Sequence, residues 1–253
     1  MGCVCSAHVE PDVGNLPEGV EVLNAKCKED VRCACDVLVR SFAGSSTTEP
    51  ELSFDFALSG YKPELKENMD DPRRQKYLRW ALHFVIQNAL VSGQKGVVFV
   101  TRSQSGTINS VMALKINKSD LKGAACSITK TLCRVGFPSM NEMSFMSCKH
   151  WIAMELAYKR LHKAQVGNIP HLYVWAVAVD TTAQKQGIGR KLMNVAASVA
   201  AKHGLPMYLE AAGNRNKAIY EKFGFRVVGQ EQLKTSGKNP DIFEEYYAMM
   251  TAQ

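Results

Sequence analysis

Residues 172–189 read Leu172-Tyr-Val-Trp-Ala-Val-Ala-Val-Asp-Thr-Thr-Ala-Gln-Lys-Gln-Gly-Ile-Gly189. The first eight residues are apolar throughout, which predicts a central strand covered on both faces. Asp180 and the two threonines after it indicate a turn. Apolar residues then recur at helical spacing as far as Lys202, and Gly204 lies just beyond, so a helix is predicted after the second glycine.

The two glycines indicate what this segment binds. Gly187 and Gly189 allow the backbone to approach a ligand closely, and the free N–H groups at a helix start favour a phosphate. A dinucleotide-binding loop would need a third glycine where Leu192 stands, and a P-loop would need a Gly-Lys-Ser/Thr sequence that is absent here. The segment therefore predicts a pyrophosphate site of another kind.

Two spaced motifs resemble those of a known family. Gln184, Gly187 and Gly189 fit the pattern Gln/Arg-x-x-Gly-x-Gly/Ala, which is the acyl-CoA-binding signature of the GNAT family of N-acetyltransferases. The block Asn216-Lys-Ala-Ile-Tyr-Glu-Lys-Phe-Gly-Phe225 looks like the second signature of that family, Asn-x-x-x-Tyr-x-x-x-Gly-Phe. Both motifs occur in the family's order, after a hydrophobic strand.

The resemblance is closest over residues 171–228. Within it, the residues around His171, Glu210 and Tyr220 are similar to the branch that includes puromycin N-acetyltransferase. The resemblance implies an α/β (α+β) fold of the GNAT type, a mixed, mainly antiparallel twisted sheet flanked by helices. It also implies one domain, which we place at residues 20–253, after a flexible tail at residues 1–19.

The same resemblance implies an enzyme. We expect an acetyl group to pass directly from acetyl-CoA, the cosubstrate, to a primary amine of a small molecule in a ternary complex. No nucleophilic cysteine is needed, because Cys126, Cys133 and Cys148 lie outside both motifs and lack a nearby Cys-His pattern. A non-catalytic acyl-CoA-binding or sensing module, a protein N-acetyltransferase and a membrane-tethered interaction protein are the alternatives.

Two residues are the candidate catalytic groups. Tyr220 stands at the position of the family's general acid, and a phenol with a pKa of about 10 can donate a proton to a departing thiolate. Packing between helix and sheet is its alternative role. Glu210 ends a predicted strand and is the candidate acceptor of the amine proton, directly or through water. Orienting substrate or fixing a loop are the alternatives for Glu210.

The resemblance also implies a set of donor-binding residues. A backbone N–H between Val177 and Val179 would polarise the carbonyl, and Asn216 would bind the pantetheine arm or cap a short helix. The family often has proline where Thr181 stands and glycine where Lys185 stands. Lys185, Arg190 and Lys191 either approach phosphate or face solvent. The full set is Val177, Val179, Gln184, Lys185, Gln186, Gly187, Ile188, Gly189, Arg190, Lys191 and Asn216.

The remaining chain is predicted to supply further helices, strands and the acceptor pocket. Helices are expected at residues 30–42, at residues 72–93 and around residues 151–161, and a hairpin at residues 96–116. Strands are also expected at residues 207–211, 225–228 and 245–250, and a short helix at 216–223. Acceptor-binding residues, or ordinary core, are expected among Phe54, Phe56, Tyr61, Phe137, Met140, Met143, Phe145, Met146 and Trp151.

Composition excludes several classes of protein. The chain has 253 residues, 46% of them hydrophobic, and 8 cysteines without zinc-finger spacing, so neither a disulfide scaffold nor a metal site is expected. Lys and Arg exceed Asp and Glu by 31 to 24, an excess that suits a phosphate-rich cosubstrate. We expect a cytoplasmic protein with no nucleic-acid partner.

The amino terminus carries a separate signal. Met1-Gly2-Cys3-Val4-Cys5-Ser6 fits the myristoylation pattern at Gly2, and Cys3 and Cys5 are available for palmitoylation. It resembles the dually acylated start of some Src-family kinases. These residues predict membrane association through a lipidated terminus; an unmodified tail is the alternative.

Overall fold

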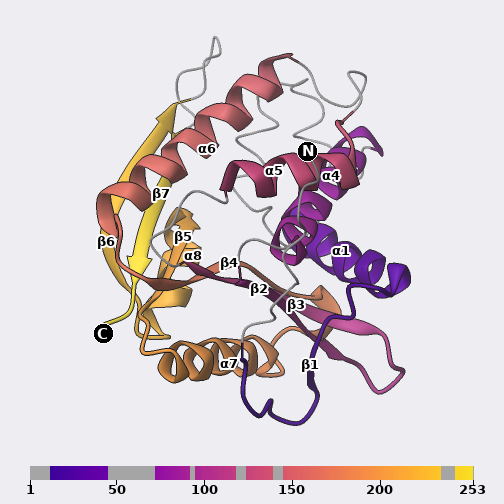
Figure 1. Ribbon diagram of the computed structural model, residues 1–253. Coiled ribbons are helices and arrows are strands. Elements are labelled where there is room, and N and C mark those ends of the chain that lie inside the picture. The colour runs from indigo at the N-terminus through magenta and orange to yellow at the C-terminus, as the bar shows by residue number, and fades with distance from the viewer. Residues whose placement is uncertain are drawn as a thin grey trace, which may run out of the picture.

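The computed structural model describes residues 12–44, 72–91, 95–117, 124–138, 145–234 and 243–252. Its centre is a seven-stranded sheet with the order β1-β2-β3-β4-β5-β7-β6, flanked by helices on both faces (Figure 1). The expected mixed, mainly antiparallel fold of the GNAT type is confirmed. The strands are β1 Val20–Val22, β2 Lys95–Arg102, β3 Ile108–Asn117, β4 His171–Val179, β5 Met207–Ala212, β6 Arg226–Lys234 and β7 Phe243–Met250.

One pair of strands differs from all the others. Every neighbouring pair is antiparallel except β4 and β5, which run parallel. Their pairing is limited to Leu172 with Met207 and Tyr173 with Tyr208. Beyond Tyr173, β4 continues beside β3 alone, with a bulge in which Trp175 has no partner residue. The sheet is therefore split between β4 and β5 along most of their length.

The helices divide between the two faces of the sheet (Figure 1). One face carries α1, α4, α5 and α6; α1 and α4 cover β2 and β3, whereas α6 covers β5 and β7. The opposite face carries α7, whose apolar side packs on the strands, and α8 beside it. The helices are α1 Lys28–Ala43, α4 Pro72–Leu90, α5 Ala124–Val135, α6 Phe145–Gln165, α7 Ile188–Lys202 and α8 Gly213–Glu221.

The predicted elements are present, but several of their ends differ and the structure has further elements. The hairpin, α4 beginning at Pro72 and α7 ending at Lys202 were expected from periodicity and are confirmed. Helix α5 was not predicted. Helix α6 begins at Phe145 rather than near residue 151, and α8 begins at Gly213, three residues before the expected start.

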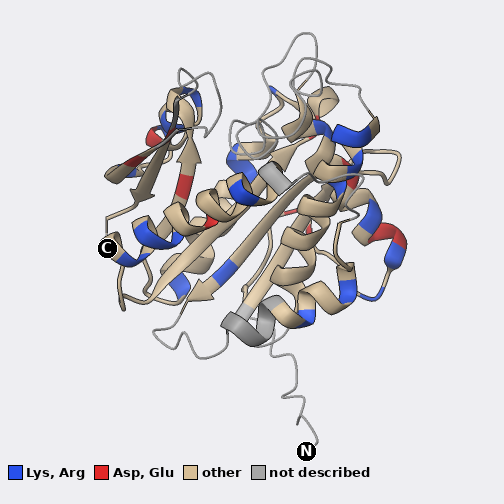
Figure 2. Cartoon of the chain, turned by 90° about the horizontal axis from the view of Figure 1, so that it is seen from above, with Lys and Arg blue, Asp and Glu red and all other residues tan. Residues whose placement is uncertain are grey.

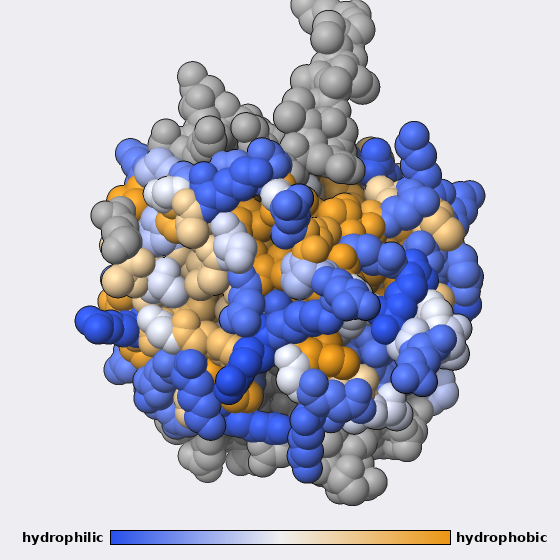
Figure 3. All heavy atoms as spheres, turned by 90° about the horizontal axis from the view of Figure 1, so that it is seen from below, coloured by the Kyte–Doolittle hydropathy of each residue, from blue (hydrophilic) through white to orange (hydrophobic). Residues whose placement is uncertain are grey.

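Part of the expected tail is packed. Val13 and Leu16 lie partly buried against the core under α7. Asp12 lies 2.5 Å from the ammonium of Lys202, and its carbonyl is 3.1 Å from Nε2 of His203. Residues 12–19 thus lie along α7, on a side of the molecule whose surface is mainly hydrophilic (Figure 3). The flexible tail was expected to extend to residue 19, whereas residues in the range 12–19 make these contacts with α7.

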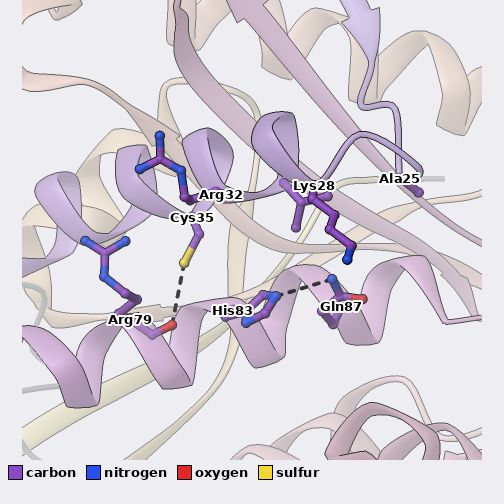
Figure 4. A pocket seen from close by; sticks show the side chains of 8 residues that line it. Ala25, Lys28, Arg32, Cys35, Arg79, His83 and Gln87 are labelled. Carbon is purple, nitrogen blue, oxygen red and sulfur yellow. Dashed lines mark hydrogen bonds between the residues drawn. The ribbon is translucent and has the colours of Figure 1, made fainter. Parts of the chain in front are cut away.

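A small hollow lies between α1 and α4 (Figure 4). It has a volume of about 340 Å³ and is lined by Lys28, Val31, Cys35 and His83 among others. Cys35 is buried, and its thiol donates to the carbonyl of Arg79 at 3.5 Å. Burial raises the pKa of Cys35 to about 12, so the thiol stays neutral. Cys35 is thus a core residue of α1.

Candidate active site

The turn between β4 and α7 has an unusual backbone. A short 3₁₀ segment, Thr181–Ala183, follows β4, and Gly187 precedes α7 with φ of 79°. Lys185 has φ of 64° and is the one non-glycine residue with positive φ among those described. This conformation explains why glycine is common at that position in the family, because only glycine adopts it without steric cost.

The space in front of the two glycines is open. A Cβ at Gly187 would have no heavy atom within 4 Å, and one at Gly189 would meet only Val179 at 3.8 Å, an ordinary contact. At Gly187 the positive φ accounts for glycine. At Gly189 no neighbour in the described chain does, so the absence of a side chain there leaves room for a ligand.

The start of α7 is free to bind an anion. Gly187 provides no side-chain cap, and the first helical hydrogen bond runs from Lys191 N–H to the Gly187 carbonyl at 3.0 Å. The N–H groups of Ile188, Gly189 and Arg190 lie ahead of that bond, at the positive end of the helix dipole. Such an arrangement suits a phosphate or pyrophosphate.

The polar residues of the loop surround this helix start. Gln184, Lys185, Gln186 and Arg190 are exposed. Gln184 also donates from Nε2 to the Val179 carbonyl at 3.3 Å, which ties the loop back to the end of β4.

Helix α1 fixes the turn from the other side. Arg40 donates to the Asp180 carboxylate at 2.8 Å, and Ser41 donates to the Val179 carbonyl at 2.9 Å. Asp180 also accepts from Thr182 N–H at 3.1 Å. Burial opposes ionisation of Asp180, but hydrogen bonds from Arg40 and Thr182 outweigh it and lower its pKa. Arg40 and Ser41 were not predicted, because about 140 residues separate them from their partners.

Glu210 lies on the face covered by α6. Its Oε2 accepts a hydrogen bond from the Tyr173 hydroxyl at 2.6 Å. Its Oε1 and the Tyr208 hydroxyl are buried without a hydrogen bond of good geometry, although the two groups are close enough for Tyr208 to act on the carboxyl. Burial raises the pKa of Glu210 to about 7; the two tyrosines lower it and the charge of Glu155 raises it. A carboxyl with this pKa can accept a proton near neutral pH.

Tyr220 lies on the opposite face, in α8. It packs partly buried on the core beneath α7, with its ring centroid 5.9 Å from that of Phe225 in an edge-on arrangement. Asn216 is the fourth residue of α8 and is also partly buried. The helix is preceded by Ala212, so the expectation that Asn216 caps it is wrong. Asn216 is therefore available for its other predicted role.

Val177 and Val179 belong to the part of β4 that is not paired with β5. They pair with Met112 and Ser110 of β3 on one edge. On the other edge no described strand is hydrogen-bonded to this half of β4. The structure therefore places the β4 backbone and Glu210 at one split, and Tyr220 on the opposite face of the sheet from Glu210.

Other predicted donor residues are less closely tied to this split. Lys191 is partly buried, and its Nζ lies 3.4 Å from where a Cβ of Gly19 would be. Its ammonium group therefore reaches toward the amino-terminal segment.

Several expectations concern residues outside the described part of the chain. These are the acylation sites Gly2, Cys3 and Cys5, and the side chains of Phe54, Phe56, Tyr61, Met140, Met143, Phe145 and Met146. Of the described acceptor candidates, Phe137 is 80% exposed, and Trp151 packs partly buried on the core.

Tyr173 and Tyr208 are site residues that the sequence analysis did not single out. Both occupy apolar-looking strand positions, and their pairing across β4 and β5 is long-range. The feature of the sequence that could have indicated their role is a tyrosine hydroxyl at two strand positions that face the same side of the sheet as Glu210.

Residues 147–227 match the family model described as acetyltransferase (GNAT) domain. The match places a GNAT acetyltransferase domain in this part of the chain. It contains the turn at residues 184–189, Glu210 and Tyr220, and supports the expectation of an N-acetyltransferase that uses acetyl-CoA. The puromycin N-acetyltransferase-like branch stays a prediction.

A curated relative is similar over part of this domain. An uncharacterized N-acetyltransferase of Schizosaccharomyces pombe is 34% identical over 70 residues, which is 28% of this chain and 28% of the relative. The matched stretch thus spans little more than a quarter of that relative's length.

Two solved structures share the fold at low identity. One, from Corynebacterium glutamicum and described as histone acetyltransferase HPA2 and related acetyltransferase, has a TM-score of 0.51 and 20% identity over 93% of this chain and 98% of its own. The arylalkylamine N-acetyltransferase 2 of Aedes aegypti has a TM-score of 0.54 and 15% identity over 92% of this chain and 97% of its own.

Among the described residues, no group of three or more His, Cys, Asp or Glu is placed to hold a metal. None of the described helices is long and apolar enough to cross a membrane.

Proposed function

We propose that the protein is an N-acetyltransferase that moves an acetyl group from acetyl-CoA directly to a primary amine of a small molecule. The observation that carries the proposal is the split between β4 and β5, with the uncapped start of α7 on one face and Glu210 on the other. A thioester held along this split would be reached by donor groups from one face and by the acceptor from the opposite one.

The residues at the start of α7 fit the phosphates of acetyl-CoA. Open space at Gly189, the free N–H groups of the first helical turn and the exposed Lys185 and Arg190 together suit a phosphate group. Asn216 is proposed to hydrogen-bond the pantetheine arm. A backbone N–H of β4 between Val177 and Val179 is proposed to polarise the thioester carbonyl.

The proposed chemistry forms one bond and breaks one. The amine nitrogen attacks the carbonyl carbon, the C–N bond forms and the C–S bond breaks. Glu210 accepts the proton that the amine loses, directly or through water, and Tyr220 donates a proton to the departing thiolate. Their positions on opposite faces suit these roles, because the nitrogen and the sulfur are different substituents of the carbonyl carbon and each needs its own proton-transfer group.

The acceptor is proposed to be a small molecule on the basis of the branch resemblance at His171, Glu210 and Tyr220. A protein amine is the second candidate. A non-catalytic acyl-CoA-binding module would have no use for a proton acceptor and a phenol on opposite faces of the same split, so we favour the enzyme.

Thiol release from acetyl-CoA, measured with a panel of primary amines and lysine-bearing peptides, tests the proposal. We expect amine-dependent release that is highest with a small molecule. Higher release with peptides would show a protein acceptor. Binding of acetyl-CoA without release for any amine or peptide would indicate the non-catalytic module and contradict the proposal.

A further inference from the structure

The side of α6 that faces the sheet carries an acidic residue. Glu155 lies one turn after Trp151 and is partly buried, close enough to Tyr77, Tyr173 and Glu210 to affect the pKa of each. Inward helix positions are normally apolar, since a charge loses its hydration there. Burial accordingly raises the pKa of Glu155, against the opposing charges of Lys159 and Lys115.

A lysine is buried on the sheet opposite this helix. Lys115 of β3 is 6% exposed, and it pairs across the strands with Tyr173, which in turn pairs with Tyr208. Its Nζ donates to Asn88 Oδ1 at 2.6 Å and lies 3.2 Å from the centre of the Trp175 ring. Burial lowers the pKa of Lys115 to about 7. Figure 2 shows that charged positions of both signs occur within the strands on this side.

Neither carboxylate has a cationic partner at contact distance. Within the described part of the chain, no Lys, Arg or His lies within ion-pair distance of Glu155 or Glu210. Among the described residues, three buried polar atoms nearby also lack a hydrogen bond: Glu210 Oε1, Tyr208 Oη and Tyr77 Oη. Buried polar atoms normally have partners, so these atoms are suited to a polar ligand.

The other groups around the cluster add no charge to its interior. His162 and His171 on the same face have pKa values lowered by burial, to about 4 for His162, and are neutral at pH 7. Lys159 is exposed to solvent. Tyr77, Tyr173 and Tyr208 have raised pKa values, first because of burial, and stay neutral. The interior groups are therefore two carboxyls, Glu155 and Glu210, and one lysine, Lys115, and burial disfavours the charged form of each.

We propose that the acceptor binds as an ammonium ion beside Glu155 and Glu210, and that Glu155 is a specificity-determining residue that selects positively charged aliphatic amines. The inference rests on the proposed function. Ionising a buried carboxyl in a site of low polarity is costly, and an entering cation offsets that cost. Glu210 takes one proton from the ammonium group before attack and passes it to solvent, and then accepts the second proton that the nitrogen loses as the amide forms.

The test uses charge variants at two positions. Glu155→Gln removes one negative charge, Lys115→Gln removes the positive charge, and the double variant keeps the formal balance of the wild type. The best amine of the thiol-release panel serves as probe, with KM for the amine, KM for acetyl-CoA and kcat measured separately. Glu29→Gln, at an exposed residue of α1, is the matched control.

The expected shifts have opposite signs. Glu155→Gln should raise KM for the amine at least about tenfold, the scale on which one nearby charge acts through an effective dielectric constant of about 20. Lys115→Gln should lower it, and the double variant should return toward the wild-type value, with KM for acetyl-CoA unchanged in all. A merely structural role would not produce opposite shifts that cancel.

The outcomes separate this inference from the function on which it rests. If no amine or peptide releases thiol, the proposed function fails and the inference with it. If amines are acetylated but KM is the same in the charge series, or rises alike in both single variants, the inference alone is overturned. Circular dichroism establishes that each variant is folded, and Lys115→Gln tests the sign independently if Glu155→Gln does not fold.

Discussion

Tyr173 of β4 pairs with Tyr208 of β5, and they are the last two residues at which these strands are joined. The Tyr173 hydroxyl also donates to Glu210, two residues further along β5. The point where the sheet opens is thus the point where Glu210, the proposed proton acceptor, is held. The helix start that follows β4 lies beyond the same opening, so one break in hydrogen bonding positions both halves of the candidate site.

Gly189→Leu should weaken acetyl-CoA binding at least about tenfold, because a side chain would occupy the space in front of the α7 N–H groups, a loss of roughly 1.4 kcal/mol or more. Calorimetric titration with acetyl-CoA measures it. Ala197→Leu, at an exposed position of the same helix, is the control and should bind normally. Equal affinity in a folded Gly189→Leu variant would show that the donor binds elsewhere.

Tyr220→Phe should lower kcat roughly 100-fold while changing acetyl-CoA affinity little, since a general acid acts in the transition state. Steady-state kinetics with the best amine, together with the binding titration, separates the two effects. A variant with wild-type kcat, when chemistry limits the rate, would identify Tyr220 as a packing residue.

Glu210 should make both rate and stability depend on pH. Its pKa, raised chiefly by burial to about 7, predicts a kcat/KM that increases as pH rises through 7. The folded state prefers the protonated carboxyl, so its contribution to the free energy of unfolding falls as pH rises from the unfolded value toward 7. Glu210→Gln should remove this fall and raise stability at pH 8, on the order of 2 kcal/mol, while abolishing turnover. Urea denaturation at pH 5 and pH 8 checks the sign; a variant less stable than the wild type at pH 8 would contradict it.

The contrast between predicted and unpredicted residues has a physical basis. Gly187, Gly189 and the strand before them act through local backbone geometry, which sequence patterns report directly. Arg40 and Lys115 act through partners on distant segments, and no local pattern indicates these contacts.

Helix α8 shows that the ends of an element are harder to predict from the sequence than its presence. The sequence pattern predicts its start at Asn216, whereas the helix, which packs against β5 and β7, begins at Gly213.

Arg40→Ala should destabilise the protein by about 1 kcal/mol, a modest value because the Arg40 side chain is half exposed. The pKa of Asp180 is lowered in the folded state, so the Arg40–Asp180 pair stabilises the protein at pH values above 3.8, the pKa of Asp180 in the unfolded state. This stabilisation is lost as the pH falls below that value. The difference between Arg40→Ala and wild type, from urea denaturation, should therefore shrink in acid. Arg32→Ala, which loses an exposed pair on the same helix, is the control. A difference that is equal at neutral and acid pH would exclude the pair as its source.

Membrane association is proposed from the amino terminus. Protein from its native cell should partition to membranes, and Gly2→Ala should release it. Replacing Cys3 and Cys5 with Ser should leave the protein reversibly bound, since one myristoyl chain binds membranes with an association constant of only about 10⁴ M⁻¹. Cell fractionation measures partition, and mass spectrometry of the native terminus measures the modification. An unacylated terminus would rule the anchor out.

Direct acetyl transfer is tested by following amide and thiol together in one reaction of acetyl-CoA with the best amine. We expect equal amounts of acetylated amine and free CoA in the wild type, and neither product at a comparable rate when Glu210→Gln and Tyr220→Phe are combined. Thiol release without amide, or undiminished amide formation by the folded double variant, would contradict it.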